Sequence, residues 1–231
     1  MVYYRKIGDI EPNGSFFTKG VVMTKVDMKK NKKRQDILDA AYELFTTKGF
    51  SSTTIMNIAL KAGVGKGTFY LYFDSKEAVR DELIVIKPSR ILTKAVNAME
   101  DSLGANRKVG VADRFIFVAD FILNYLSKDL TLLRFVSKNL SWGLFLNSRI
   151  EEKNSDVINF KDFISLLIER DHVHLKNPDI LIYTLIEMVN STCYSVLINE
   201  DPVSFEEYKP YLYHCIRLLI DDARENLVLA R

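Results

Sequence analysis

Residues that interrupt helices are scarce in this chain, which has 10 glycines and 5 prolines among 231 residues. Its apolar residues recur mostly three and four positions apart, the spacing that places side chains on one face of an α-helix. No run of alternating apolar and polar residues is long enough to predict a β-sheet. We therefore predict an all-α fold, in which helices bury their apolar faces against one another.

Charge is distributed unevenly along the chain. The net charge is only +2, but residues 1–80 carry a net charge of +6 and residues 81–231 a net charge of −4. A basic first third and an acidic remainder indicate two parts with different partners. The overall composition, 48% hydrophobic and 27% charged, excludes a largely disordered chain.

Membrane and secreted classes are not favoured by the sequence. No charge-free apolar stretch reaches the ~18–20 residues of a membrane-spanning helix, and Lys19 interrupts the one apolar stretch near the N-terminus. The two cysteines, Cys193 and Cys215, are too few for a disulfide framework and are expected to remain thiols. We therefore expect a cytoplasmic protein that does not enter a membrane.

Three segments are predicted along the chain. Residues 1–28 lack a clear period and are expected to be a flexible leader, in which Met23 and Met28 are alternative start sites. Residues 29–76 are expected to form a small helical domain and residues 77–231 a larger one. A helix beginning at Ser75 should kink or end near Lys87, because Pro88 follows. Longer helices are predicted at 109–127, 131–147, 156–170, 178–198 and 205–228.

Two short helices joined by a tight turn at Gly63 are predicted in the small domain, the helix-turn-helix arrangement. Thr53 is expected to cap the first helix, and residues 65–73 to form the second. Hydrogen-bond donors and flat aromatic rings on the second helix suit contacts with phosphates and base edges in a DNA major groove. A run of basic residues, 29–34, would add salt-sensitive affinity for the DNA backbone. The candidate DNA-contacting residues are Lys33, Thr53, Thr54, Lys66, Gly67, Thr68, Tyr70, Tyr72 and Lys76.

A larger set of residues at fixed spacing makes the interpretation more specific. The set comprises Ala41, Leu44, Phe45, Gly49, Phe50, Thr53, Ile58, Ala59, Ala62, Gly63, Val64, Gly67, Thr68, Tyr70, Tyr72, Phe73, Lys76 and Glu77. With these residues, the segment 34–83 resembles the N-terminal domain of the tetracycline-repressor (TetR) family of bacterial transcription regulators. Gly65 departs from the family pattern, which usually has Ser or Thr there, so the hydroxyl that would cap the second helix is missing.

The resemblance implies a function for the whole chain. It implies a homodimer that binds a palindromic operator in double-stranded DNA and a C-terminal domain that binds a small-molecule effector, most simply a repressor released by that effector. The apolar helices near 178–198 and 205–228 would form the dimer interface. Candidate pocket residues combine aromatic walls with occasional polar groups. They are Phe117, Phe121, Trp142, Phe145, Tyr183, Asn190 and Tyr194.

Two other functions are also compatible with the sequence. One is a helical enzyme or small-molecule carrier with a vestigial helix-turn-helix, and the other is a constitutive DNA-binding protein with a solid core. No nucleophile elbow, metalloprotease motif or dinucleotide-binding turn is found in the sequence, so we expect no enzyme activity and no cofactor. The three histidines and two cysteines lack the spacing of metal ligands, so no metal site is expected.

Overall fold

The computed structural model describes residues 25–103, 109–139, 158, 160–171 and 173–224. These residues form α-helices, with one isolated bridge between Leu175 and Arg224, so the predicted all-α fold is confirmed. They divide into two compact units, an N-terminal unit that includes residues 25–85 and a C-terminal unit that includes residues 86–224. The predicted boundary after residue 76 lies earlier, at the start of a helix that contributes to both units.

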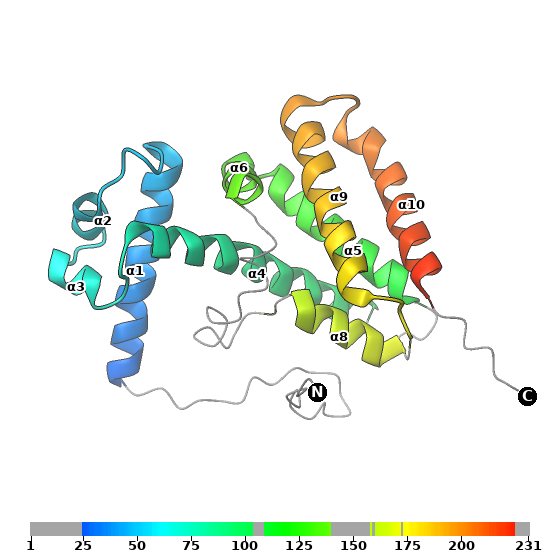
Figure 1. Ribbon diagram of the computed structural model, residues 1–231, viewed down its shortest axis with the longest axis horizontal. Coiled ribbons are helices and arrows are strands. Elements are labelled where there is room, and N and C mark those ends of the chain that lie inside the picture. The colour runs from blue at the N-terminus through cyan, green and yellow to red at the C-terminus, as the bar shows by residue number, and fades with distance from the viewer. Residues whose placement is uncertain (1–24, 104–108, 140–157, 159, 172, 225–231) are drawn as a thin grey trace, which may run out of the picture. The chain divides into compact units, whose positions relative to one another are not determined.

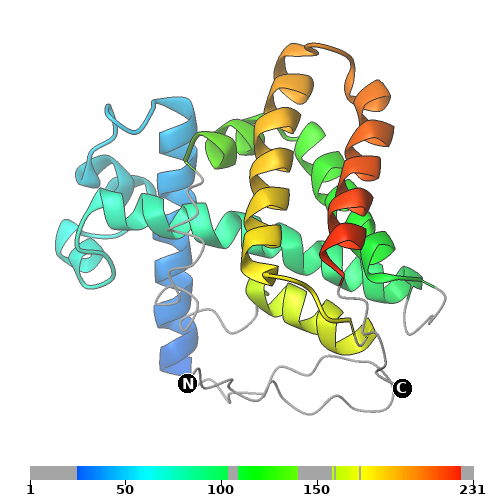
Figure 2. The same cartoon turned by 45° about the vertical axis from the view of Figure 1, so that its right-hand side comes forward.

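The N-terminal unit contains three helices and the beginning of a fourth (Figure 1). The helices are α1 (Lys25–Thr47), α2 (Ile55–Lys61), α3 (Lys66–Tyr70) and the first turns of α4 (Lys76–Leu103). In Figures 1 and 2, α2 and α3 lie on the same side of α1, and the first turns of α1 extend beyond them. Residues 25–28, expected in the leader, belong to α1.

Burial in this unit follows the apolar pattern of the sequence. Ile37 and Ala41 of α1, Ile58 of α2 and Phe69 of α3 are fully buried, and Val79 of α4 joins the same core. These side chains hold the short helices α2 and α3, which would not be stable alone at such lengths. Packing of the first helix therefore fixes the orientation of the helix-turn-helix.

Two glycines end the helices of this unit. Gly49, after α1, has a φ of +84°, and Gly63, between α2 and α3, has a φ of +66°. Only glycine adopts this left-handed region without a steric penalty. Space is not the constraint, because a Cβ atom at either position would meet no atom within 4 Å.

In the described residues, the C-terminal unit contains the remainder of α4 and five further helices. These are α5 (Val111–Ser127), α6 (Leu130–Asn139), α8 (Phe160–Asp171), α9 (Pro178–Asn199) and α10 (Phe205–Ala223). Figures 1 and 2 show α9 and α10 side by side, and α5 packs against α10. Their bounds agree with the predicted spans to within a few residues, apart from the predicted positions 140–147, 156, 157, 159 and 225–228, which lie outside the described residues.

Helix α4 does not end near Lys87. It continues through Pro88 to Leu103, so the prediction of an early end is wrong. Proline removes one backbone hydrogen bond from a helix interior, a cost that tertiary packing can offset. The following residues supply that packing, because Ile91, Leu92, Ala95 and Val96 are all buried in the core of the C-terminal unit.

A buried ion pair also lies in this core. Arg114 of α5 is 1% exposed, and its Nε atom lies 3.5 Å from Oδ1 of Asp171 at the end of α8. A second ion pair joins Arg170 of α8 to Glu100 of α4. Asp171 and Arg170 both belong to α8, so the two ion pairs fix the position of α8 against α5 and α4.

Candidate nucleic-acid interface and ligand cavity

The turn between α2 and α3 is held by backbone hydrogen bonds and by buried side chains. The N–H of Val64 donates to the carbonyl of Ala59 at 2.9 Å, and the N–H of Gly63 donates to the carbonyl of Leu60 at 3.2 Å. Ala59 is 1% exposed, so its small side chain lies in the core of the unit. Helix α3 is thereby held in one orientation, as an element that reads DNA must be.

The outer face of α3 carries the predicted DNA-contacting side chains. Lys66, Gly67 and Tyr70 are exposed, and Thr68 and Tyr72 are partly buried. Tyr70 is oriented by the buried Phe69, whose ring lies edge-on to it at a centroid distance of 5.7 Å. Gly65 is the N-cap residue of α3, without a side-chain cap bond, as the missing hydroxyl requires.

Exposed apolar side chains on this unit were not among the sequence candidates. Leu71, at the end of α3, is 80% exposed, and Leu60 and Met56 of α2 are also exposed. Apolar side chains near a major groove can contact the methyl group of thymine. The sequence signal was weak, because leucine and methionine at helical spacing usually indicate core.

Thr53 has a different role from the predicted one. Thr54, not Thr53, is the N-cap of α2: the Asn57 N–H donates to its side chain, and its own N–H donates to Asn57 Oδ1, both at 3.1 Å. Thr53 is fully buried; its hydroxyl donates to the Gly49 carbonyl at 2.8 Å, and its N–H donates to the Phe50 carbonyl. The N–H groups of both threonines are thus bonded within the unit, and a contact between either threonine and DNA stays a prediction.

Lys76 is likewise engaged within the unit. Its Nζ atom donates to the carbonyls of Phe50 and Thr53, at 3.0 and 2.9 Å, and lies 4.5 Å from the centre of the Phe50 ring. Two of its three N–H donors thus hold the segment between α1 and α2 against the start of α4. A contact between Lys76 and DNA remains a prediction that only the third donor could satisfy.

The lysines at the start of α1 are exposed. Lys29, Lys30, Lys32 and Lys33 all lie in the first turns, which extend beyond the core of the unit. Arg34 marks where packing begins, because it pairs with Glu82 of α4 and lies 5.0 Å from the centre of the Phe73 ring. The basic run, which includes Lys33, therefore forms an exposed part of α1, and its contact with phosphates stays a prediction.

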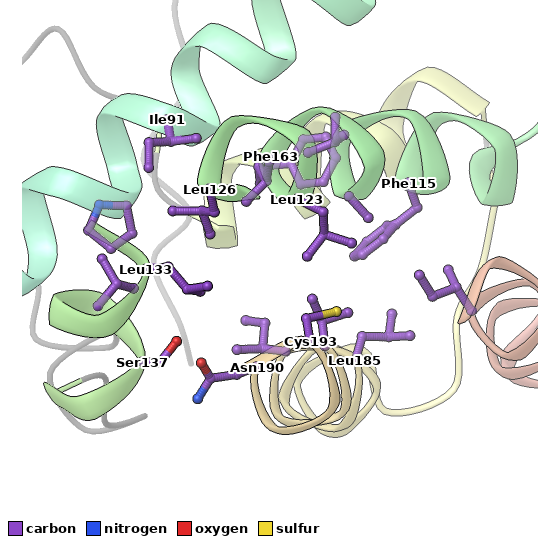
Figure 3. A pocket seen from close by; sticks show the side chains of 18 residues that line it. Ile91, Phe115, Leu123, Leu126, Leu133, Ser137, Phe163, Leu185, Asn190 and Cys193 are labelled. Atoms are coloured by element: carbon purple, nitrogen blue, oxygen red, sulfur yellow. The ribbon is translucent and has the colours of Figure 1, made fainter. Parts of the chain in front are cut away.

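A cavity of about 120 Å³ lies within the C-terminal unit (Figure 3). Side chains from α4, α5, α6, α8, α9 and α10 line it, and almost all are apolar. Among the described residues the lining is Pro88, Ile91, Phe115, Val118, Ala119, Ile122, Leu123, Leu126, Leu133, Val136, Ser137, Phe163, Leu185, Ile186, Val189, Asn190, Cys193 and Ile216. A concave apolar site with few polar groups is typical of a small-molecule pocket.

Of the seven predicted pocket residues, Asn190 lines this cavity. Phe117 and Phe121 pack against the surrounding core without reaching it, and Tyr194 does not line it either. Tyr183 is 44% exposed on the outside of α9. Trp142 and Phe145 lie outside the described residues. The cavity is instead formed mainly by aliphatic side chains, which the sequence could not separate from ordinary core.

Both cysteines are free thiols, as expected. Cys193 is buried at the cavity, and desolvation raises the pKa of its thiol to about 11, so the thiol is uncharged at neutral pH. Cys215 is exposed on α10. Within the described residues, no group of three or more His, Cys, Asp or Glu side chains is placed to hold a metal ion.

Helix α9 is 22 residues long and rich in apolar residues. Among the described helices it alone is long and apolar enough, by length and composition, to cross a membrane, although 28% of its most apolar stretch is buried in the structure. The sequence prediction rested on charge-free stretches, and α9 contains Asp179 and Glu187. Its outward face carries the exposed Ile180 and Tyr183.

The N-terminal unit, with a short exposed helix held after a glycine turn, defines a helix-turn-helix protein of the kind that reads DNA. Residues 37–83 match the family described as bacterial regulatory proteins, tetR family. These residues include the helix-turn-helix, so the N-terminal unit is a TetR-family DNA-binding domain. TetR-family names among the similar proteins support the same assignment.

Similar proteins extend this match beyond the N-terminal unit. The regulator YdgC of Bacillus subtilis is 31% identical over 126 residues, which are 54% of this chain and 59% of YdgC. The transcriptional repressor KstR2 of Rhodococcus jostii is 42% identical over 55 residues, 24% of this chain and 27% of KstR2. The chain thus spans less than two thirds of the length of these relatives.

Solved structures share the fold. The regulator FadR from Bacillus subtilis, solved in complex with stearoyl-CoA, matches with a TM-score of 0.55 and 17% identity, covering 80% of this chain and 97% of FadR. Because the match covers 80% of this chain, the likeness extends into the C-terminal unit. The predicted architecture of a helix-turn-helix domain and a larger helical domain is therefore confirmed.

Proposed function

We propose that this protein is a ligand-responsive transcriptional repressor that binds DNA through α3 and a small molecule in the cavity of the C-terminal unit. The observation that carries the proposal is that one chain contains both a fixed helix with exposed Lys66 and Tyr70 and a separate, largely apolar cavity. The cavity favours this function over a constitutive DNA-binding protein with a solid core. Repression is supported by the name of the relative KstR2. A DNA partner implies a cytoplasmic location.

The DNA-contacting surface combines two elements of the N-terminal unit. Helix α3 offers Lys66, Thr68 and Tyr70 to the base edges and nearby phosphates, and the start of α1 adds four exposed lysines. Cationic side chains bind phosphates regardless of sequence, whereas contacts in the major groove discriminate between bases. We therefore assign sequence preference to α3 and salt-dependent affinity to α1.

A homodimer is supported by the exposed faces of α9 and α10. Tyr211 and Leu218, seven residues apart on α10, are 71% and 55% exposed, and Ile180 is 64% exposed on α9. Large apolar side chains at helical spacing on a surface indicate a partner. Thr184 and Ser191 are also exposed on α9, a mixture that suits a second protein copy better than lipid. Two copies would present two α3 helices to a palindromic operator.

Oligomeric state tests this part of the proposal. Sedimentation velocity of the full chain should show a dimer, and the double variant Tyr211→Glu with Leu218→Glu should shift it to monomer, because buried charges oppose association. The matched control is Leu60→Glu, which alters another exposed leucine in the N-terminal unit and should leave the dimer intact. A monomeric wild-type protein at micromolar concentration would contradict the proposed interface.

Signal transfer would use α4. This helix contributes Val79 and Leu83 to the core of the N-terminal unit and Pro88 and Ile91 to the wall of the cavity. A ligand that binds one arrangement of α4 more tightly than another shifts the population toward that arrangement. The expected consequence is a changed position of the two α3 helices in the dimer and a lower affinity for the operator.

Selection from a random 30-base-pair duplex library, followed by fluorescence anisotropy, tests DNA binding. The full-length protein should enrich a palindromic sequence, and Lys66→Ala and Tyr70→Ala should each weaken binding to it at least tenfold. The control is Lys61→Ala, which removes an exposed α2 lysine whose Nζ lies 2.6 Å from Glu43 Oε1. Failure to enrich any sequence at low salt would favour the alternative of a helical carrier or enzyme with a vestigial helix-turn-helix.

A further inference from the structure

We propose that the cavity selects an uncharged, mainly apolar ligand the size of one aromatic ring with a short substituent, and that Asn190 and Ser137 bind a polar group at one end of it. This inference rests on the proposed function, because it concerns the effector of that same cavity. It goes further by naming the charge, size and orientation of the ligand.

The described lining of the cavity is uncharged, which disfavours a charged ligand. Among the described lining residues there is no Asp, Glu, Lys, Arg or His side chain. The ionisable group present, the Cys193 thiol, is neutral at physiological pH. A carboxylate or ammonium moved from water into such surroundings would lose its hydration without gaining an ionic partner. A neutral ligand loses much less.

Two polar side chains at one end of the cavity would determine the orientation of the ligand. Figure 3 shows Ser137 from α6 and Asn190 from α9 at one end of the cavity, with Phe115 toward the other. Neither polar side chain makes a hydrogen bond to another described residue. Both side chains are only partly buried, so water can occupy their polar atoms until a ligand that carries one donor or acceptor takes its place. The rest of the ligand would contact aliphatic and aromatic side chains.

The volume limits the ligand size. A cavity of about 150 Å³ lined by Leu, Ile and Phe accommodates benzene, and this cavity measures about 120 Å³ with the same kind of lining. The volume alone matches a single ring, and a short polar substituent can extend past it at the end where Ser137 and Asn190 are only partly buried. Such a molecule would place its ring between Phe115, Phe163 and Leu123, and its polar atom near Asn190.

Three probes of similar size separate these properties. 2-Phenylacetamide and phenylacetate have equal numbers of heavy atoms and differ in charge at pH 7.5, and propylbenzene lacks a polar group. Dissociation constants are measured with the full-length protein by ligand-observed NMR. We expect phenylacetamide to bind and phenylacetate to bind at least tenfold more weakly. Phenylacetate that binds as tightly as the amide would overturn the inference about charge.

Variants test the orientation. Asn190→Leu should weaken phenylacetamide three- to tenfold, the range for one lost hydrogen bond, and change propylbenzene by less than twofold. Asn199→Leu makes the same exchange at an exposed asparagine at the end of α9 and serves as the matched control. Equal losses for both probes in Asn190→Leu would refute a polar role for Asn190. Ala119→Phe, which fills the cavity, should abolish binding of both probes; a far-UV circular dichroism spectrum verifies its fold.

DNA binding measured in parallel keeps this inference distinct from the proposed function. If no probe binds while the wild-type protein binds its selected duplex, the inference on ligand class is wrong and the DNA-binding function stands. If the probes bind in the expected order but no duplex is selected, the ligand class stands and the proposed function is wrong.

Discussion

Replacing Lys76 by methionine tests whether this side chain stabilises the helix-turn-helix or contacts DNA. Methionine retains the apolar stem and removes the ammonium group, which donates to the carbonyls of Phe50 and Thr53. A hydrogen bond to a charged group contributes about 1.5–3 kcal/mol. Lys76 is only partly buried and water would replace part of each interaction, so we expect the variant to lose about 2 kcal/mol for the two bonds together.

Hydrogen exchange measured by mass spectrometry on the full-length protein localises this loss. A destabilisation of about 2 kcal/mol corresponds to a roughly thirtyfold increase in exchange rate. The increase should appear in peptides that contain α2 and the end of α1, and peptides from α5 provide an internal reference in the other unit. The matched control is Lys66→Met, whose exposed side chain should change stability by less than about 0.5 kcal/mol.

The two substitutions should affect DNA affinity in the opposite order to their effects on stability. Lys66→Met should weaken binding to the selected duplex more than Lys76→Met when both are measured at a temperature where the variants are folded. If Lys76→Met exchanges like the wild-type protein and weakens DNA binding as strongly as Lys66→Met, the internal role assigned to Lys76 is refuted.

Four further changes have expected outcomes. Thr54→Ala removes the cap of α2 and should cost about 1 kcal/mol in urea unfolding; an unchanged midpoint would contradict the cap. Gly65→Ser should add a few tenths of a kcal/mol and tighten DNA binding in anisotropy, because a Cβ there meets only ordinary contacts. Replacing Lys29, Lys30, Lys32 and Lys33 by Gln should flatten the plot of log affinity against log salt by about 0.9 per lost phosphate contact. Arg217 lowers the pKa of Asp113 through a hydrogen bond and its charge, so the stabilisation is present near neutral pH and is lost as the pH falls through the lowered pKa. Asp113→Asn should therefore cost less than about 1 kcal/mol at pH 7 for this partly exposed pair, and calorimetry should show this cost vanishing at low pH.

The helix-turn-helix could be predicted because its local requirements are visible in residue types. Gly49 and Gly63 occupy positive-φ positions that other residues rarely adopt. The buried face of Ile58, Ala59 and Phe69 follows directly from helical spacing. Local conformation and core packing agree here, and such agreement makes a sequence pattern informative.

The partners of Thr53 and Lys76 could not be predicted in the same way. A threonine before a helix and a lysine after a recognition helix are both good candidates for DNA contacts, because either can donate to a phosphate. The outcome depended on carbonyl groups at the end of α1 and the turn after it, which folding brings within hydrogen-bond distance. Sequence spacing contains no measure of that distance.

The cavity was missed for a physical reason. The aromatic residues chosen as pocket candidates are large enough to fill space, and Phe117 and Phe121 pack against the core without lining the cavity. A cavity forms where packed helices leave a volume unfilled, so its walls are the same Leu, Ile and Val residues that form core elsewhere. Asn190 could be singled out because an amide on an apolar helix differs from its surroundings, and it does line the cavity.

Pro88, where the sequence wrongly predicted a helix end, lies in the helix that would transmit the proposed signal. Proline has no backbone N–H, so α4 lacks one backbone hydrogen bond at Pro88 even though the helix continues through this residue. The same residue lines the cavity, close in sequence to the division between the two units after Val85. A bound ligand would therefore touch α4 where the helix resists bending least. Pro88→Ala should restore the hydrogen bond and stiffen α4, so that ligand still binds the protein but releases less DNA at saturation. Unchanged release by this variant would show that the signal does not depend on a weak point at Pro88.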